Sequence, residues 1–308
     1  MPKLLFVDTN IYLDFYRIRN EVKTHFLSHL EAIKDHLIMT DQVEMEFKKN
    51  RQSAILEGLQ QLKAPGKISV PSVLRQDKSS KALDKDIENI KKRIQKLRAR
   101  YEKVLENPVR YDRVYQVLQR LFAKRKDIDL YRKSKKRYDI RELAQKRFNL
   151  GYPPRKKNDT SIGDAINWEW LVHIAKEKNT DIWIVSRDGD YGVTLGDKGF
   201  VNDWLKQEFK ERINKQRKLI LCPRLSQALK EFDIPVTPEE EKEESRVINL
   251  KARLIAPTMT PNATTSCCDD EGMDDVEVEC GICGVPAVRS AMTFRDPWGY
   301  ICGNHFDI

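Results

Sequence analysis

Short apolar runs alternate along the chain with longer segments of helical periodicity, and this alternation limits the possible folds most strongly. The apolar runs cover residues 3–7, 37–39, 181–186 and 218–222. Each run has the length of a buried strand, and the segments between them carry apolar side chains every three or four residues. The pattern predicts an α/β fold in which helices cover both faces of a central parallel sheet.

Carboxylates follow two of the predicted strands, at the point where each strand ends. Asp8 and Asp188 occupy these positions, with Asp190 close by, and Glu46 and Asp164 lie near the starts of helices. The carboxyl ends of parallel strands form a crevice where ligands bind. Carboxylates that converge there repel one another unless divalent cations neutralise them, and oxygen ligands favour Mg²⁺ or Mn²⁺. Taken singly, an Asp at a strand end is more often a cap or turn residue, so the prediction depends on the four acids together.

Four motifs that contain these acids resemble, in order, the motifs of PIN-domain ribonucleases. They are Phe6–Asn10, Asp41–Glu46, Ile162–Ile166 and Val185–Tyr191. The second has a Val-x-x-Glu pattern, which selects Glu46 over Glu44, although Asp41 stands where a proline is frequent. The segment from Gly151 to Trp168 is similar to a bacterial PIN-like subfamily with a helical insertion before the third motif. The resemblance covers roughly residues 1–235.

This resemblance implies a three-layer α/β/α sandwich that cleaves RNA with one or two Mg²⁺ or Mn²⁺ ions. Asp8, Glu46, Asp164 and Asp188 would bind the metal. Asn10 would orient Asp8, Ser186 would support the pocket, and Asp190 would be either a further ligand or a turn residue.

The positive charge is concentrated in one part of the chain. Residues 78–147 hold 24 basic and 10 acidic residues, whereas residues 239–308 hold 6 basic and 14 acidic residues. A basic segment of this kind indicates a polyanionic partner, most often nucleic acid, although a solvated helical surface has the same composition.

Within the basic segment, apolar residues recur at alternating spacings of four and three residues from Leu83 to Val104. This is coiled-coil spacing. It predicts an antiparallel helical hairpin over residues 78–125, inside an insertion of about residues 63–147, with arms of roughly 35–40 Å. The same apolar seam would suit a protein partner or a second copy of the chain.

The last part of the sequence contains a zinc signature. Cys280 and Cys283 are followed by Cys302 and His305, and glycine lies inside both pairs. A C-x₂-C and C-x₂-H set predicts a closed, structural tetrahedral Zn²⁺ site in a zinc-ribbon-like module over residues 280–308. We expect residues 236–279 to be an acidic and polar linker, in which Cys267 and Cys268 are thiols.

The sequence therefore predicts a cytoplasmic, metal-dependent endoribonuclease, of the kind found among bacterial toxins or antiphage defence effectors. It contains no apolar run of membrane-spanning length and no signal peptide. Two alternatives stay open. One is a nuclease that acts on single-stranded DNA. The other is a non-catalytic module that binds nucleic acid or protein through the basic hairpin and the zinc module.

Overall fold

The computed structural model describes residues 2–60, 62–66, 68–155 and 161–255, together with four short strands after residue 276. The chain divides into two compact units, residues 1–256 and 257–308.

The first unit is built around a four-stranded parallel sheet. Its strands are β1 (Lys3–Val7), β2 (Leu37–Ile38), β3 (Asp181–Val185) and β6 (Leu219–Cys222), in the order β2-β1-β3-β6. Val7 is in register with Val185, so the strands β1 and β3 end side by side. The residues that follow these two strands therefore lie next to each other at one edge of the sheet.

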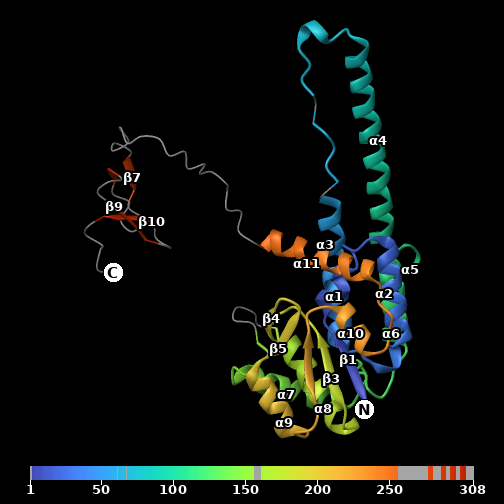
Figure 1. Ribbon diagram of the computed structural model, residues 1–308, viewed down its shortest axis with the longest axis vertical. Helices are drawn as coiled ribbons and strands as arrows, with labels where there is room; N and C mark the ends of the chain where they lie inside the picture. Colours follow the sequence, from blue (N-terminus) through green and yellow to red (C-terminus); the bar gives the residue numbers. More distant parts are fainter. Residues whose placement is uncertain are drawn as a thin grey trace. The chain divides into compact units, whose positions relative to one another are not determined.

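Helices flank the sheet on both faces (Figure 1). They are α1 (Thr9–Asp14), α2 (Asn20–Ala32), α3 (Asp41–Gln60), α6 (Arg113–Ala123), α7 (Lys136–Asn149), α8 (Gly163–Lys178), α9 (Asp203–Arg212) and α10 (Leu225–Glu231). A hairpin of β4 (Gly192–Leu195) and β5 (Lys198–Val201) lies beside β6. Trp168 and Trp170 of α8 and Phe47 of α3 are fully buried. This architecture confirms the predicted α/β class with a central parallel sheet.

A long helix, α4 (Lys78–Glu106), projects from this unit, and residues 62–66 and 68–77 run beside it (Figure 1). Its 29 residues correspond to about 43 Å. The short helix α5 (Pro108–Tyr111) connects it to α6. At its base, α4 contacts α3, where Arg98 donates to the carbonyl of Leu62.

The predicted hairpin over residues 78–125 is wrong in its second arm. Instead of returning along α4, helix α6 packs into the core, with its apolar face fully buried: Val114, Val117, Leu118 and Leu121. The seam of α4 is consequently only partly covered. Ile87 is 8% exposed, whereas Leu83, Ile90 and Leu97 are 36–42% exposed.

The region after α6 also belongs to the packed unit, so only part of the expected insertion, residues 63–147, projects from it. Leu130 bridges to Thr40 beside β2, and α7 packs on α8. There, Nε of Arg147 donates to Oε1 of Glu169 over 2.7 Å, with both side chains buried. Residues 113–149 therefore extend the sandwich.

The expected linker is wrong for residues 238–255, which form the helix α11 (Pro238–Ile255) packed against α2 and α10. Three of its acidic side chains, Glu240, Glu243 and Glu244, are buried because they bind the rest of the unit. Both oxygens of Glu244 accept from the first amides of α10, Leu225 at 2.7 Å and Ser226 at 3.1 Å. Glu243 accepts from the amide of Arg19 at 2.9 Å.

In the second unit, β7 (Glu277–Glu279) pairs with β8 (Pro286–Val288), and β9 (Met292–Arg295) pairs with β10 (Gly299–Cys302), both antiparallel. Cys302 is the last residue of β10. The other predicted zinc ligands, Cys280, Cys283 and His305, lie outside the described residues, as do Cys267 and Cys268. In the described ranges, no helix is both long and apolar enough to cross a bilayer.

Candidate carboxylate site

A pocket of about 200 Å³ lies at the carboxyl edge of the sheet, and all four acids singled out in the sequence line it: Asp8, Glu46, Asp164 and Asp188. They come from the end of β1, from α3, from the first turn of α8 and from the loop after β3. Asn10, Lys49, Asn50 and Ser161 also line the pocket. Glu44 does not; its carboxylate accepts from Lys48 at 2.6 Å outside it.

Asp8 is the most buried of these acids, with 3% of its surface exposed. The hydroxyl of Ser186 donates to its Oδ2 over 2.6 Å, and the amide of Thr9 donates to Oδ1 over 2.6 Å. The side-chain amide of Asn10 donates to the same Oδ2 over 3.3 Å. Burial nevertheless raises the pKa of Asp8 to about 6, and the nearby Asp188 and Glu46 carboxylates add to the rise. The ionised form of Asp8 therefore lacks sufficient positive charge around it.

Glu46 is held in place by its neighbours on both sides. Oε2 accepts from the hydroxyl of Thr9 at 2.9 Å, and Oε1 accepts from the side-chain amide of Gln42 at 2.6 Å. Gly163, at the start of α8, lies against the same carboxylate. A Cβ at this position would lie 2.4 Å from Oε1 of Glu46. Any larger residue at this position would have to displace the Glu46 carboxylate, so glycine lets α8 bring Asp164 next to Glu46 in this arrangement, a close approach that the sequence pattern did not reveal.

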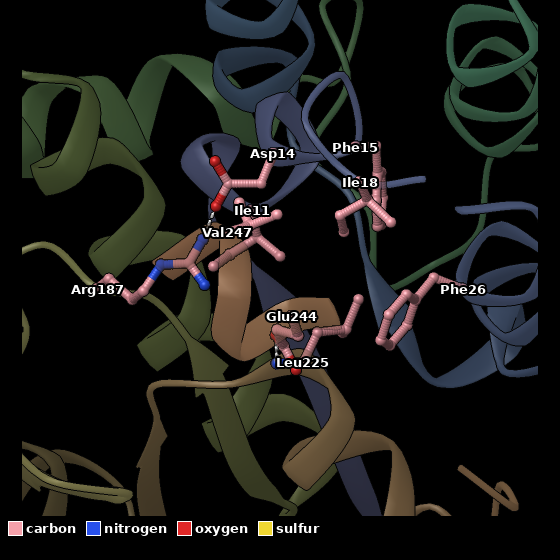
Figure 2. A pocket seen from close by; sticks show the side chains of 9 residues that line it. All are labelled: Ile11, Asp14, Phe15, Ile18, Phe26, Arg187, Leu225, Glu244 and Val247. Atoms are coloured by element: carbon pink, nitrogen blue, oxygen red, sulfur yellow. Dashed lines mark hydrogen bonds and ion pairs between the residues drawn. The ribbon is translucent and has the colours of Figure 1, made fainter. Parts of the chain in front are cut away.

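The loop that carries Asp188 is fixed at two points. The amide of Asp188 donates to the hydroxyl of Ser186 over 3.1 Å. Figure 2 shows the second point, where the guanidinium of Arg187 forms an ion pair with Asp14 of α1. Asp190 is buried at 9% exposure but does not line the pocket. Arg187 is a residue that sequence reasoning missed, because its partner lies on a distant element.

Tyr191 is a second residue whose place the sequence did not indicate. Its side chain is 1% exposed, and its hydroxyl has no hydrogen-bond partner within the described part of the chain. Burial raises its pKa well above the usual value, and Asp164, Asp8 and Glu46 add to the rise. The phenol therefore stays protonated beside the carboxylates.

Comparison with known proteins agrees with this geometry. A family model described as PIN domain matches residues 5–191, which contain all four acids of the pocket. The chain belongs to the PIN-domain family. PIN domains are typically metal-dependent nucleases and generally bind nucleic acid. No curated protein and no solved structure matches the chain.

The donor chemistry of the PIN-domain pocket fits a hard divalent cation. Carboxylate and amide oxygens are the ligands that Mg²⁺ and Mn²⁺ prefer. Asp8 is buried with too little compensating charge, and the hydroxyl of Tyr191 beside it is unpaired among the described residues. No three of the described carboxylate, histidine or cysteine side chains are already grouped around one point. Mg²⁺ tolerates this arrangement, because it keeps several waters and takes only one or two carboxylates directly.

Proposed function

We propose that this protein is a Mg²⁺- or Mn²⁺-dependent endoribonuclease whose active site is the carboxylate pocket. The observation that carries the proposal is the buried Asp8 with its raised pKa, in a pocket that carboxylates from three other elements also line. Such a cluster destabilises the folded chain by itself and becomes favourable once a divalent cation binds. Its presence in a lined pocket therefore supports a catalytic metal site.

Each residue of the pocket has a distinct part in this proposal. Asp8, Glu46, Asp164 and Asp188 would hold the cation, while Ser186, Thr9 and Gln42 orient the first two of them. Asn10 orients Asp8, and Asp190, buried behind the pocket, acts as a support rather than a ligand. Lys49, on the rim, offers its ammonium to the substrate phosphate. A bound cation supplies activation of water and stabilisation of charge on the phosphate oxygens.

The positive charge of α4, which we call the arm, supports a nucleic-acid substrate. Between residues 91 and 100, α4 carries six basic residues and no acidic ones. Its side chains there are almost all exposed, as phosphate contacts require. We expect this surface to hold the backbone of single-stranded or structured RNA while the pocket cleaves it.

Cleavage by the purified full chain tests the proposal. Labelled single-stranded RNA and DNA of one sequence are incubated with Mg²⁺ or Mn²⁺ and with wild type or Asp164→Asn. We expect RNA cleavage that EDTA and Asp164→Asn abolish. Cleavage of DNA alone would reassign the substrate. Binding without cleavage by wild type would instead favour the non-catalytic alternative.

The extra parts of the chain suggest a specialised role, as in a toxin or antiphage defence effector that recognises a particular RNA. Sequencing of RNA ends from cells that express wild type or Asp164→Asn would identify that RNA. The exposed seam of α4 offers a surface for a protein partner or a second copy of the chain.

We further propose one structural Zn²⁺ per chain at Cys280, Cys283, Cys302 and His305, measurable as bound metal that Cys283→Ser abolishes.

A further inference from the structure

A second cavity, of about 430 Å³, lies where the base of the arm meets the sandwich. Helices α2, α3, α4 and α5 contribute to its walls, and it shares no lining residue with the carboxylate pocket. Two kinds of side chain dominate it. Three tyrosines, Tyr16, Tyr101 and Tyr111, supply aromatic surface, and three cations, Lys23, Arg100 and Arg113, supply charge.

The cavity has an excess of positive charge. Its one lining carboxylate, Asp112, is already satisfied: Nε of Arg51 and the hydroxyl of Tyr16 each donate to its Oδ2 over 2.7 Å. Lys23 donates to the neutral side chain of Asn20 over 2.7 Å. In the described part of the chain, Lys23, Arg100 and Arg113 form no ion pair. An anionic group in the cavity would compensate these three cations.

Lys23 strengthens this argument because it is only partly exposed. Burial lowers the pKa of its ammonium, and the nearby Asp112 carboxylate offsets only part of that effect. An ammonium in this setting gains more from an anionic partner than a fully hydrated one does.

The tyrosine side chains line part of the cavity, and a simple inorganic anion bound to the three cations would leave that part unfilled. Tyr111 lines the cavity and is 44% exposed, with the guanidinium of Arg110 5.3 Å from its ring centre. Tyr16 is fixed by stacking on Phe47, with ring centres 6.4 Å apart. Tyrosine rings of this kind are the surfaces on which nucleobases stack in single-strand recognition. A volume of about 430 Å³ also falls within the usual range for small-molecule sites.

We propose that this cavity binds one nucleotide, with the base against Tyr101 and Tyr111 and the phosphate on Lys23, Arg100 and Arg113. Two sources share this chemistry: a free mononucleotide, and one residue of an RNA strand whose other part occupies the carboxylate pocket. The second source rests on the proposed function, whereas the site itself does not. Glu46 and Ile55, which line the two pockets, are nine residues apart on α3, or about 14 Å along its axis. A strand of a few nucleotides spans that distance.

Calorimetric titration of the full chain tests the proposal, with AMP, an eight-residue oligouridylate and inorganic phosphate as probes. The titrations use an Asp164→Asn background, so that no RNA is cleaved. Arg100→Gln with Arg113→Gln removes two cations from the cavity. Lys206→Gln with Lys210→Gln makes the same charge change on the exposed face of α9 and is the matched control. Tyr111→Ala removes the ring, and Tyr111→Phe restores it without the hydroxyl.

We expect one equivalent of AMP to bind, about tenfold or more weakly in the arginine variant and unchanged in the lysine control. Tyr111→Ala should weaken binding, and Tyr111→Phe should retain it. The same losses seen only with the oligouridylate would assign the site to an RNA residue. Equal affinity for phosphate and AMP, no binding of any probe, or affinities that the cavity variants leave unchanged would overturn the proposal. These outcomes do not depend on cleavage, so failure of the proposed activity is distinguishable from failure of this site.

Discussion

The hydroxyl of Ser186, at the end of β3, donates a 2.6 Å hydrogen bond to Oδ2 of Asp8, at the end of β1. This bond joins the two central strands at the edge where the acids gather. It also favours the ionised form of Asp8, which burial and the neighbouring carboxylates oppose. Burial has the larger effect, so the folded chain binds a proton at Asp8 more tightly than the unfolded chain does.

Asp8→Asn should therefore stabilise the metal-free protein at neutral pH. The pKa of Asp8 is about 6 in the folded state against 3.8 ordinarily, so stability is lost as pH rises from about 4 to about 6. In EDTA at pH 7.5, we expect Asp8→Asn to unfold at a higher temperature, with an advantage of about 2–3 kcal/mol. Thermal unfolding across pH 4–8 measures this. The advantage should shrink toward pH 4, and a variant less stable than wild type at pH 7.5 in EDTA would contradict the account.

Gly163→Ala should reduce activity without unfolding the chain. The added Cβ would lie 2.4 Å from Oε1 of Glu46 and 2.5 Å from Nε2 of Gln42, so it must displace the carboxylate. Alanine is otherwise the better helix former, so α8 itself should not suffer. We expect cleavage to fall about tenfold or more. The control is Gly189→Ala, where a Cβ meets nothing within 4 Å; equal losses in both variants would refute the role of Gly163.

Much of the site was predictable because local pattern determines it. Asp8 and Asp188 each follow a buried apolar run, and parallel pairing of β1 with β3 then brings the two together. Glu46 was separable from Glu44 by motif alone, and the structure places only Glu46 in the pocket. The close approach of Gly163 and the ion pair of Arg187 depend on neighbours from other elements, which a local pattern does not specify.

The incorrect parts of the fold have the same physical origin. The apolar spacing of α6 suits a partner helix as well as it suits the core, so periodicity did not show that its apolar face packs away from α4. The acidic run at residues 239–244 has the composition of a solvated linker. Two of its buried carboxylates, Glu240 and Glu243, instead find partners more than 200 residues away in sequence: the ring of His29 for Glu240 and the amide of Arg19 for Glu243.

Neutralising the arm should weaken RNA binding for all sequences alike. Lys91, Lys92, Arg93 and Lys96 lie on the basic part of α4. Every phosphate that the arm no longer neutralises should flatten the log–log salt dependence of binding by about 0.7. Binding measured at several salt concentrations, with these four side chains replaced by Gln, tests this. An unchanged salt slope would show that α4 is a solvated helix without a role in RNA binding.

Glu244→Gln should destabilise the first unit. Glu244 is 4% exposed and accepts from two backbone amides of α10, those of Leu225 and Ser226. Figure 2 shows Glu244 beside Leu225. Gln keeps only one acceptor oxygen. We expect a loss of about 1–3 kcal/mol in the free energy of unfolding, measured in urea. Glu239→Gln, at an exposed position of the same helix, is the control and should change little. Equal stability of Glu244→Gln and wild type would mean that the two hydrogen bonds from α10 to Glu244 do not stabilise the fold.

The rate of RNA cleavage by Glu46→Gln and Glu44→Gln tests the central claim most directly. The two substitutions make the same chemical change two residues apart on α3, but only Glu46 lines the carboxylate pocket. We expect Glu46→Gln to lower the Mg²⁺-dependent cleavage rate at least about a hundredfold, because the pocket loses charge where the cation would bind. Glu44→Gln should cleave as wild type does. Full activity in Glu46→Gln, or equal losses in both variants, would contradict the assignment of this pocket as the active site.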